Sequence, residues 1–216
     1  MRALIKIALA LAGIFTLTFV VIRLSGVLDI VQIKAWLLAA QEWSPWVVGG
    51  IVIVLLWVDI VIAVPTLAVA ISAGYFLGFA HGALATFTGL VLSGMSGYGL
   101  GHVLGEKALR FAVRDTQQRD EAMLLFQQRG LVMIVLSRAV PILPEISSCL
   151  AGITRMSLIR FVLAWLASIV PYTLVATYAG SISTVEDPTP AIYATIALSL
   201  CLWLSWYLFH RSNKSP

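Results

Sequence analysis

The sequence is short of charged residues. Only 11% of its 216 residues are Asp, Glu, Lys or Arg, whereas 60% are hydrophobic. Soluble domains carry about 25% charged and 45–50% apolar residues. The 14 basic and 10 acidic side chains are therefore too few to give this chain a water-compatible surface. The composition excludes a disordered chain and an ordinary soluble enzyme, and it predicts an all-α polytopic membrane protein.

The sequence also lacks the motifs of catalytic and metal centres. HExxH, CxxC and GxSxG are absent, and the string GYGLGHVLG (residues 97–105) has no Gly-Lys-Ser/Thr of a phosphate-binding loop. The two cysteines, Cys149 and Cys201, lie in apolar stretches and do not form a disulfide framework. We therefore expect no metal, no cofactor and no enzyme activity. The net charge of +4 does not indicate nucleic-acid binding, because the bases form short clusters between apolar runs, as in membrane proteins.

Apolar runs divide the chain into three parts. Residues 1–45 are expected to hold a retained membrane helix and an interfacial segment, residues 46–182 a central membrane domain, and residues 183–216 a last span and tail. A spanning helix needs about 20 mostly apolar residues. The full spans expected on this basis are 4–22, 83–105, 161–182 and 191–209. Tryptophans near the span ends are expected to anchor at lipid headgroups: Trp36, Trp43, Trp46, Trp165, Trp203 and Trp206.

The bases set the expected orientation, because loops rich in Lys and Arg face the cytoplasm. The polar loop at 106–129 holds five bases, whereas the acidic turn at 183–190 holds none. Four full spans place both termini and all basic loops in the cytoplasm only under one condition. Segments 46–81 and 130–153 must each leave the membrane on the side from which they entered it. Both segments are then re-entrant hairpins. In the alternative, 46–64 crosses fully and the 106–129 loop lies outside.

Prolines fall near the middle of both expected hairpins. Pro65 lies in the first hairpin, and Pro141 and Pro144 lie in the second. A proline removes a backbone donor and breaks a helix. Broken backbone at membrane depth persists only inside protein or around a water-filled cavity. The prolines therefore favour hairpins that turn within the membrane domain.

The two hairpins share a weak sequence pattern. DIVIAVP (residues 59–65) and RAVPILP (residues 138–144) each place a charged residue six positions before a proline, and each runs on to an Ala-Gly pair at 73–74 or 151–152. Because the hairpins enter from opposite sides, the pattern predicts inverted repeats, which are typical of secondary transporters. A coincidence of spacing is the alternative.

Three charged residues lie in the expected membrane segments. Asp59 is the only charge between Trp46 and Gly105, and Arg138 and Glu145 lie in the second hairpin. A charged residue at a helix centre costs at least about 2.5–3.5 kcal/mol, and a guanidinium presents a flat fork that suits carboxylate or phosphate. We predict that Asp59, Arg138 and Glu145 bind substrate or ions. The alternative is a structural bridge between Arg138 and Glu145.

Small residues recur every four positions in two stretches of the central domain. Such spacing lets membrane helices approach closely. The glycines expected to pack helices in this way are Gly74, Gly78, Gly82, Gly97, Gly101 and Gly105.

Residues 137–180 resemble the DedA superfamily, also called the VTT or SNARE-associated domain. The resemblance is carried by an arginine, a proline, two dipeptides and the phenylalanine that opens the next span: Arg138, Pro141, Ala151-Gly152, Arg155-Met156 and Phe161. Upstream, Pro65, Ala73-Gly74 and Gly78-x3-Gly82 are similar to the first half of the domain, so the resemblance covers roughly residues 46–181.

The resemblance implies two opposed re-entrant hairpins and lipid translocation. Bacterial members are linked to the return of undecaprenyl phosphate across the cytoplasmic membrane and to the proton-motive force, and eukaryotic relatives scramble phospholipids. Members carry essential acids in the first hairpin and essential arginines in the second, the first of which matches Arg138. The chain departs from the family where a second arginine is common, since Pro144 and Glu145 stand there, and Asp59 precedes Pro65 instead of following it.

The sequence therefore favours a flippase or transporter of an anionic lipid headgroup, with proton coupling through Asp59 or Glu145 as a further expectation. An ion-coupled transporter of a small solute and a non-transporting membrane scaffold are the alternatives. The expected partners are membrane lipids and protons, a homo-oligomer is left open, and the expected location is the bacterial inner membrane.

Overall fold

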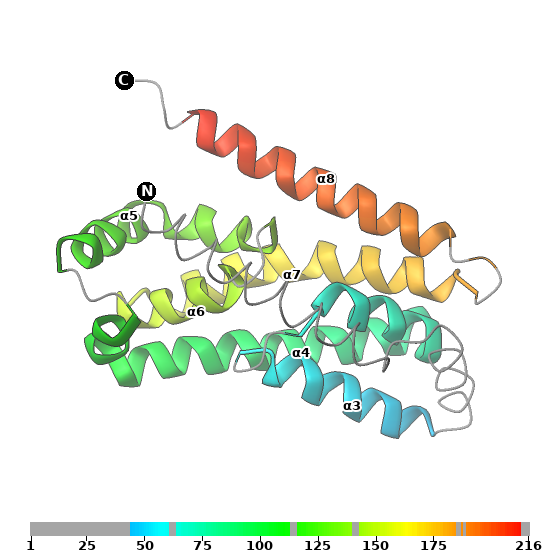
Figure 1. Ribbon diagram of the computed structural model, residues 1–216. Coiled ribbons are helices and arrows are strands. Elements are labelled where there is room, and N and C mark those ends of the chain that lie inside the picture. The colour runs from blue at the N-terminus through cyan, green and yellow to red at the C-terminus, as the bar shows by residue number, and fades with distance from the viewer. Residues whose placement is uncertain are drawn as a thin grey trace, which may run out of the picture. The chain divides into compact units, whose positions relative to one another are not determined.

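The computed structural model describes residues 44–60, 64–112, 116–139, 143–184, 187 and 189–212 (Figure 1). These residues form helices and short connections, and none of them is in a strand. The prediction of an all-helical protein is therefore confirmed for the described part of the chain. The expected span at 4–22, the interfacial segment that follows it and Pro141 lie outside the described residues.

The described residues form six α-helices and one 3₁₀ turn. They are α3 (Pro45–Val58), α4 (Thr66–Ala112), α5 (Thr116–Val135), η1 (Ser137–Ala139), α6 (Leu143–Ile153), α7 (Leu158–Ser181) and α8 (Thr189–Ser212). Two helical stretches, Thr66–Val103 and Leu158–Ser181, are long and apolar enough to cross a membrane by length and composition. Shorter apolar helices lie at Pro45–Val58, Leu143–Ile153 and Thr189–Cys201.

Helix α4 is divided by two glycines with positive φ. Gly78 has φ 72° and ψ 174°, and Gly105 has φ 50°. The chain reverses at Gly78, because a Cβ at Gly82 would lie only 2.6 Å from the carbonyl oxygen of Ala73. Residues 66–77, the short segment of α4, therefore run back along residues 79–104, its long segment (Figure 1).

Gly78 and Gly105 thus differ from the packing glycines predicted from sequence. A Cβ at either position would meet no atom within 4 Å. Both glycines serve backbone conformations that residues with a Cβ rarely adopt. The four-residue spacing could not separate this use from close packing, because both need the smallest side chain.

The expected loop at 106–129 is largely helical, which corrects the sequence interpretation. Helix α4 continues to Ala112 and α5 begins at Thr116. The loop was inferred from its charges alone. Charge tells where a segment meets water and does not exclude a helix with a polar surface. The helix that leads into the second expected hairpin is α5, which begins before residue 130.

The described helices form two similar repeats. In the first repeat, α3 is followed by a break, the short segment of α4 and its long segment; in the second, α5 is followed by η1, α6 and α7. The short helix of each repeat packs on the long helix of the other. A Cβ at Gly74 would overlap the backbone of Thr177 in α7, and a Cβ at Gly152 would overlap the backbone of Tyr98 in α4.

Two further glycines complete this reciprocal contact. A Cβ at Gly180 would overlap the backbone of Ile71, and a Cβ at Gly101 would overlap that of Cys149. Ile71 and Cys149 hold the same place in the two repeats, because each precedes its Ala-Gly glycine by three residues. The backbone contacts therefore follow the Ala73-Gly74 and Ala151-Gly152 pattern of the sequence.

The end of α6 explains the Arg155-Met156 dipeptide. The N–H of Met156 donates to the carbonyl of Ala151 at 3.0 Å, and Arg155 adopts φ 56°. This left-handed residue ends the helix in the manner of a Schellman cap. The hydroxyl of Tyr98 donates to the carbonyl of Met156 at 2.6 Å, which ties this turn to the long segment of α4.

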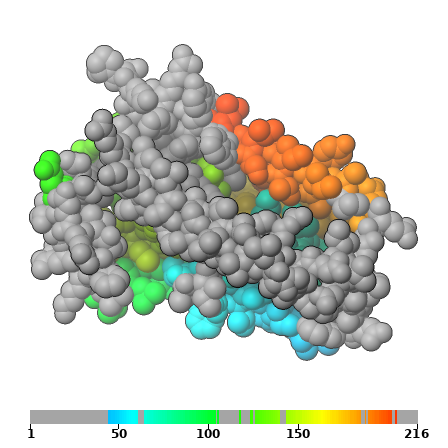
Figure 2. All heavy atoms as spheres, viewed as in Figure 1, coloured from blue at the N-terminus to red at the C-terminus, as the bar shows by residue number. Residues whose placement is uncertain are grey.

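The core lies where the two repeats meet, whereas large apolar side chains face outward on several helices. Fully buried residues include Leu56, Leu90, Phe126, Ile134, Phe161 and Ile169. Trp46 on α3, Leu163 on α7 and Tyr193 on α8 are exposed. Atoms of α3 (blue to cyan) and α8 (orange) form part of the surface in Figure 2. Apolar side chains on the outer faces of helices suit contact with lipid.

The connection between α7 and α8 is polar. The hydroxyl of Thr189 donates to the carboxylate of Asp187, and so does the backbone N–H of Thr189. These two hydrogen bonds, the hydroxyl bond more strongly, hold the pKa of Asp187 below its usual value. An acidic side chain before the first turn of α8 also interacts favourably with the helix dipole.

Candidate functional site

The first repeat breaks its helix at a buried carboxylate. Helix α3 ends at Val58, and Asp59, which follows it, is only 6% exposed. The N–H of Val64 donates to Oδ1 of Asp59 at 2.7 Å. The side chain thus satisfies a backbone donor that the interrupted helix leaves without a partner. Pro65 follows at once, and Thr66 begins the short segment of α4.

The second repeat breaks its helix at a guanidinium. Arg138 lies in η1, directly after α5, and the hydroxyl of Ser137 donates to the carbonyl of Ile134 at 2.7 Å. Pro144 stands in the first turn of α6, where the missing N–H of a proline is tolerated. Glu145 follows it in the same turn.

The structure brings the three predicted charged residues together. The carboxyl groups of Asp59 and Glu145 lie close enough to interact with each other and with the charge of Arg138. Asp59 belongs to the first repeat, whereas Arg138 and Glu145 belong to the second. The cluster therefore joins both helix breaks.

Two aromatic rings of α7 hold the Arg138 side chain. Its Cζ lies 5.4 Å from the ring centre of Trp165 and 5.3 Å from that of Tyr172. These are cation–π distances. The hydroxyl of Tyr172 lies 3.1 Å from Oγ1 of Thr66, so the clamp is anchored in the first repeat.

Sequence reasoning missed this aromatic clamp. Trp165 was expected at the headgroups, but it is buried and its indole N–H donates to the carbonyl of Leu90 at 3.0 Å. The signal was the spacing of Trp165 and Tyr172, which are seven residues apart and so lie on one face of a helix. Position near a span end outweighed that spacing in the interpretation.

Three polar atoms around the cluster have no hydrogen-bond partner among the described residues. They are Nε of Arg138, Oε2 of Glu145 and Oγ of Ser168. A buried polar atom without a partner is unfavourable, and native proteins rarely keep one without a reason. Arg138 and Glu145 thus keep an unpaired N–H donor and an unpaired carboxyl oxygen within the cluster, and Ser168 lies on α7 between the two residues of the clamp.

Gly97 lets the long segment of α4 pack closely beside the charged cluster. A Cβ at Gly97 would lie 2.9 Å from Cδ1 of Ile60 and 3.0 Å from Cβ of Ser148. Ile60 directly follows Asp59, and Ser148 is one turn beyond Glu145 on α6. The glycine therefore lets the long segment of α4 approach both helix breaks at once.

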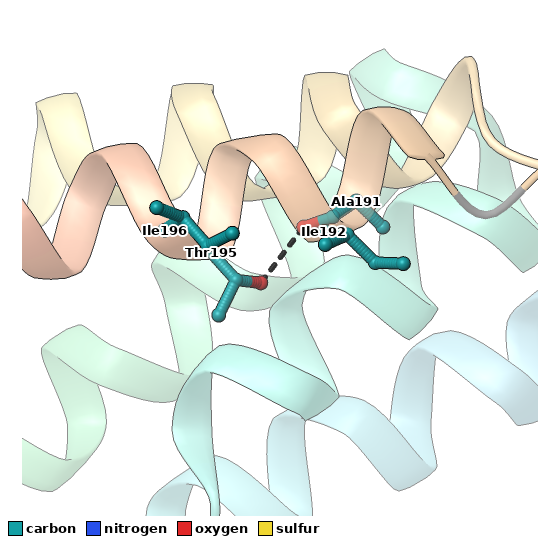
Figure 3. A pocket seen from close by; sticks show the side chains of 4 residues that line it. All are labelled: Ala191, Ile192, Thr195 and Ile196. Atoms are coloured by element: carbon teal, nitrogen blue, oxygen red, sulfur yellow. Dashed lines mark hydrogen bonds between the residues drawn. The ribbon is translucent and has the colours of Figure 1, made fainter.

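The described residues offer neither a metal-binding group of side chains nor a second pocket suited to a charged ligand. No group of three His, Cys, Asp or Glu side chains comes together in the described ranges. A hollow of about 240 Å³ lies on α8, lined by Ala191, Ile192, Thr195 and Ile196 (Figure 3). Its one polar side chain, Thr195, donates to the carbonyl of Ala191 at 2.8 Å. The hollow therefore has neither a charge nor a free polar group.

Comparison with protein families gives one match. The family model of the VTT domain matches residues 64–182, which is more than half of the chain. The matched region includes Arg138, Glu145 and the aromatic clamp, and it begins after Asp59. No curated protein matches the chain. No solved structure matches it either.

Proposed function

The chain belongs to the VTT-domain family, the domain of the DedA proteins, and we propose that it moves an anionic lipid headgroup across the bacterial inner membrane. The family is membrane-associated, and the long segment of α4 and helix α7 belong to the stretches Thr66–Val103 and Leu158–Ser181, which are long and apolar enough to span a bilayer by length and composition. The substrates that fit the proposal are a polyprenyl phosphate and a phospholipid. The protein acts as a transporter and not as an enzyme.

The observation that carries the proposal is the position of Arg138. Its guanidinium is held by Trp165 and Tyr172 and its Nε has no protein partner among the described residues. A guanidinium cannot lose its proton, and its fork of donors matches a phosphate. The unpaired Nε–H is a donor that neither carboxyl group of the cluster uses, so it is left for a bound anion.

The two helix breaks give the proposed path. Both expected hairpins are re-entrant and opposed in this proposal, and their tips meet at the charged cluster. The headgroup passes between the tips while the acyl or prenyl tails stay in lipid along the outward apolar faces. Four full spans, including one at 4–22, then place both termini in the cytoplasm, as the basic residues require.

The pair of carboxyl groups supports coupling to protons. Two neighbouring carboxyl groups repel each other when both are ionised, so one of them readily holds a proton. In this proposal the pair formed by Asp59 and Glu145 stores a proton beside the cation that binds the headgroup. In this proposal, release of that proton accompanies movement of the anion.

The proposal is tested by reconstitution of the full chain in proteoliposomes. Translocation of a polyprenyl phosphate and of a common phospholipid is measured for the wild type, Asp59→Asn and Arg138→Gln, with the amount of folded protein measured for each. We expect wild-type translocation of at least one lipid and its loss in both variants at equal protein amount. Loss of folded protein in place of transport would indicate a scaffold. A wild type that moves neither lipid would refute the proposal.

A further inference from the structure

The hydroxyl groups of α7 fall into two classes. Thr177 donates to the carbonyl of Thr173 at 2.7 Å, and Ser181 donates to the carbonyl of Tyr178 at 2.8 Å. Such bonds to the preceding turn are the usual solution for Ser and Thr within apolar helices. Ser168 is only 6% exposed, yet its hydroxyl has no partner in the described part of the chain.

Ser168 lies on the face of α7 that holds Arg138. It follows Trp165 by three residues and precedes Tyr172 by four, which are the spacings of neighbours on one helix face. Both rings contact the same guanidinium, at 5.4 and 5.3 Å. Ser168 therefore lies on the same helix face as the two aromatic residues and between them along the helix.

Two donors at this place have no acceptor among the described residues: the Nε–H of Arg138 and the hydroxyl of Ser168. Oδ1 of Asp59, the acid of the first repeat, already accepts from the N–H of Val64 at 2.7 Å. A group that presents two acceptor oxygens to these donors would satisfy both of them. An oxyanion such as a phosphate has this geometry.

We propose that Ser168 is a further binding residue, whose hydroxyl donates to the same oxyanion as Arg138. The inference rests on the proposed function and adds to it the α7 wall of the headgroup site. Ser168 binds the phosphate oxygens directly, and Trp165 and Tyr172 act as positioning residues because they orient the guanidinium without touching the ligand through a donor.

Thr173 offers a matched control on the same helix. It is buried, and its hydroxyl also lacks a partner among the described residues. It lies five residues beyond Ser168, which is roughly 140° around the helix. Thr173→Val thus removes a similar buried hydroxyl that lies on a different face of the same helix.

The experiment compares Ser168→Ala, Ser168→Cys and Thr173→Val with the wild type in the lipid translocation assay, together with the thermal midpoint of each protein. We expect Ser168→Ala to slow translocation about ten- to a hundredfold, the usual range for one lost hydrogen bond to a charged group. Its thermal midpoint should equal or exceed that of the wild type, because a buried hydroxyl without a protein partner is removed. Ser168→Cys, a weaker donor of similar volume, should also be slow, and Thr173→Val should keep the wild-type rate.

The outcomes separate this inference from the proposed function. Translocation by the wild type, its loss in Arg138→Gln and a wild-type rate in Ser168→Ala would overturn the role of Ser168 alone. A slow Ser168→Ala with a lowered midpoint, beside Ser168→Cys at the wild-type rate, would assign the residue to packing and also overturn it. A wild type that moves no lipid would refute both. A parallel measurement of inorganic phosphate uptake distinguishes free phosphate from a lipid headgroup, and we expect no uptake.

Discussion

The sharpest structural prediction compares two glycines of one helix. Gly99 and Gly101 both lie in the long segment of α4. A Cβ at Gly99 would meet nothing within 4 Å, whereas a Cβ at Gly101 would overlap the carbonyl oxygen of Cys149 and lie 2.8 Å from its carbonyl carbon. The obstacle at Gly101 is backbone, so no side-chain rotation relieves it, and α6 must move away from α4.

The two substitutions are expected to change the free energy of unfolding in opposite directions. Gly99→Ala removes a flexible residue from a helix interior, which stabilises by about 0.5–1 kcal/mol. Overpacking a tight contact costs about 1–3 kcal/mol, and an obstacle made of backbone favours the upper end. At about 2–4 °C per kcal/mol for a chain of this size, Gly101→Ala should lower the thermal midpoint by roughly 6–12 °C. Gly99→Ala should leave the midpoint unchanged or raise it by a few degrees.

The assay is thermal unfolding of the purified full chain in detergent, followed by the fraction that remains monodisperse on size exclusion. Both variants make the same chemical change two residues apart, so the effect of alanine itself cancels between them. Equal midpoints for Gly99→Ala and Gly101→Ala would refute the close approach of α6 to α4. That approach holds Glu145 in the charged cluster, so the reciprocal packing of the two repeats would be refuted with it.

Three further predictions concern the turn, the clamp and the proton. Gly78→Ala should lower the midpoint by several degrees, because φ 72° with ψ 174° strains a residue with a Cβ by about 1–3 kcal/mol; Gly50→Ala, in α3 with nothing within 4 Å, is the control that should not. Tyr172→Phe keeps the ring that contacts Arg138 but loses the hydrogen bond to Thr66. This substitution should lower the free energy of unfolding by about 1 kcal/mol. Thr66→Val added to Tyr172→Phe should lower the free energy of unfolding by little more, because the hydrogen bond is already lost. If the effects of the two single substitutions simply add in the double variant, the contact is contradicted. Glu145→Gln should translocate lipid without responding to an imposed pH gradient, and a wild-type response would separate Glu145 from proton coupling.

The charged cluster was foreseen from sequence more fully than its surroundings. Asp59, Arg138 and Glu145 stood out because an ionisable residue in an apolar run is costly, and that cost does not depend on the fold. A pairing of Asp59 with Arg138 across the two repeats is a hypothesis that their matching places in the pattern favour, but the sequence cannot establish it, since it depends on how the repeats pack. The repeat pattern gave the right correspondence because the same Ala-Gly pair makes the same backbone contact in both halves.

Other features were lost where one residue type serves two purposes. Gly78 and Gly82 belong to the same four-residue pattern, but only Gly82 packs against backbone, whereas Gly78 reverses the chain. Trp165 has the position expected of a headgroup anchor and is buried against Arg138. Ser168 gave no signal in the sequence, because an unpaired hydroxyl is recognised only when its neighbours are known.

The central claim is that a lipid headgroup enters the cluster formed by Asp59, Arg138 and Glu145. The most direct test is photo-crosslinking in proteoliposomes, with a phosphate lipid that carries a diazirine either on its headgroup or on its tail, and with adducts mapped by mass spectrometry. The headgroup probe is expected to label peptides that contain residues 138–148 and 165–172, and Arg138→Gln should remove this labelling. The tail probe is expected to label outward faces such as those around Trp46 and Ile192. A headgroup probe that labels only those outward faces, unchanged by Arg138→Gln, would contradict the account.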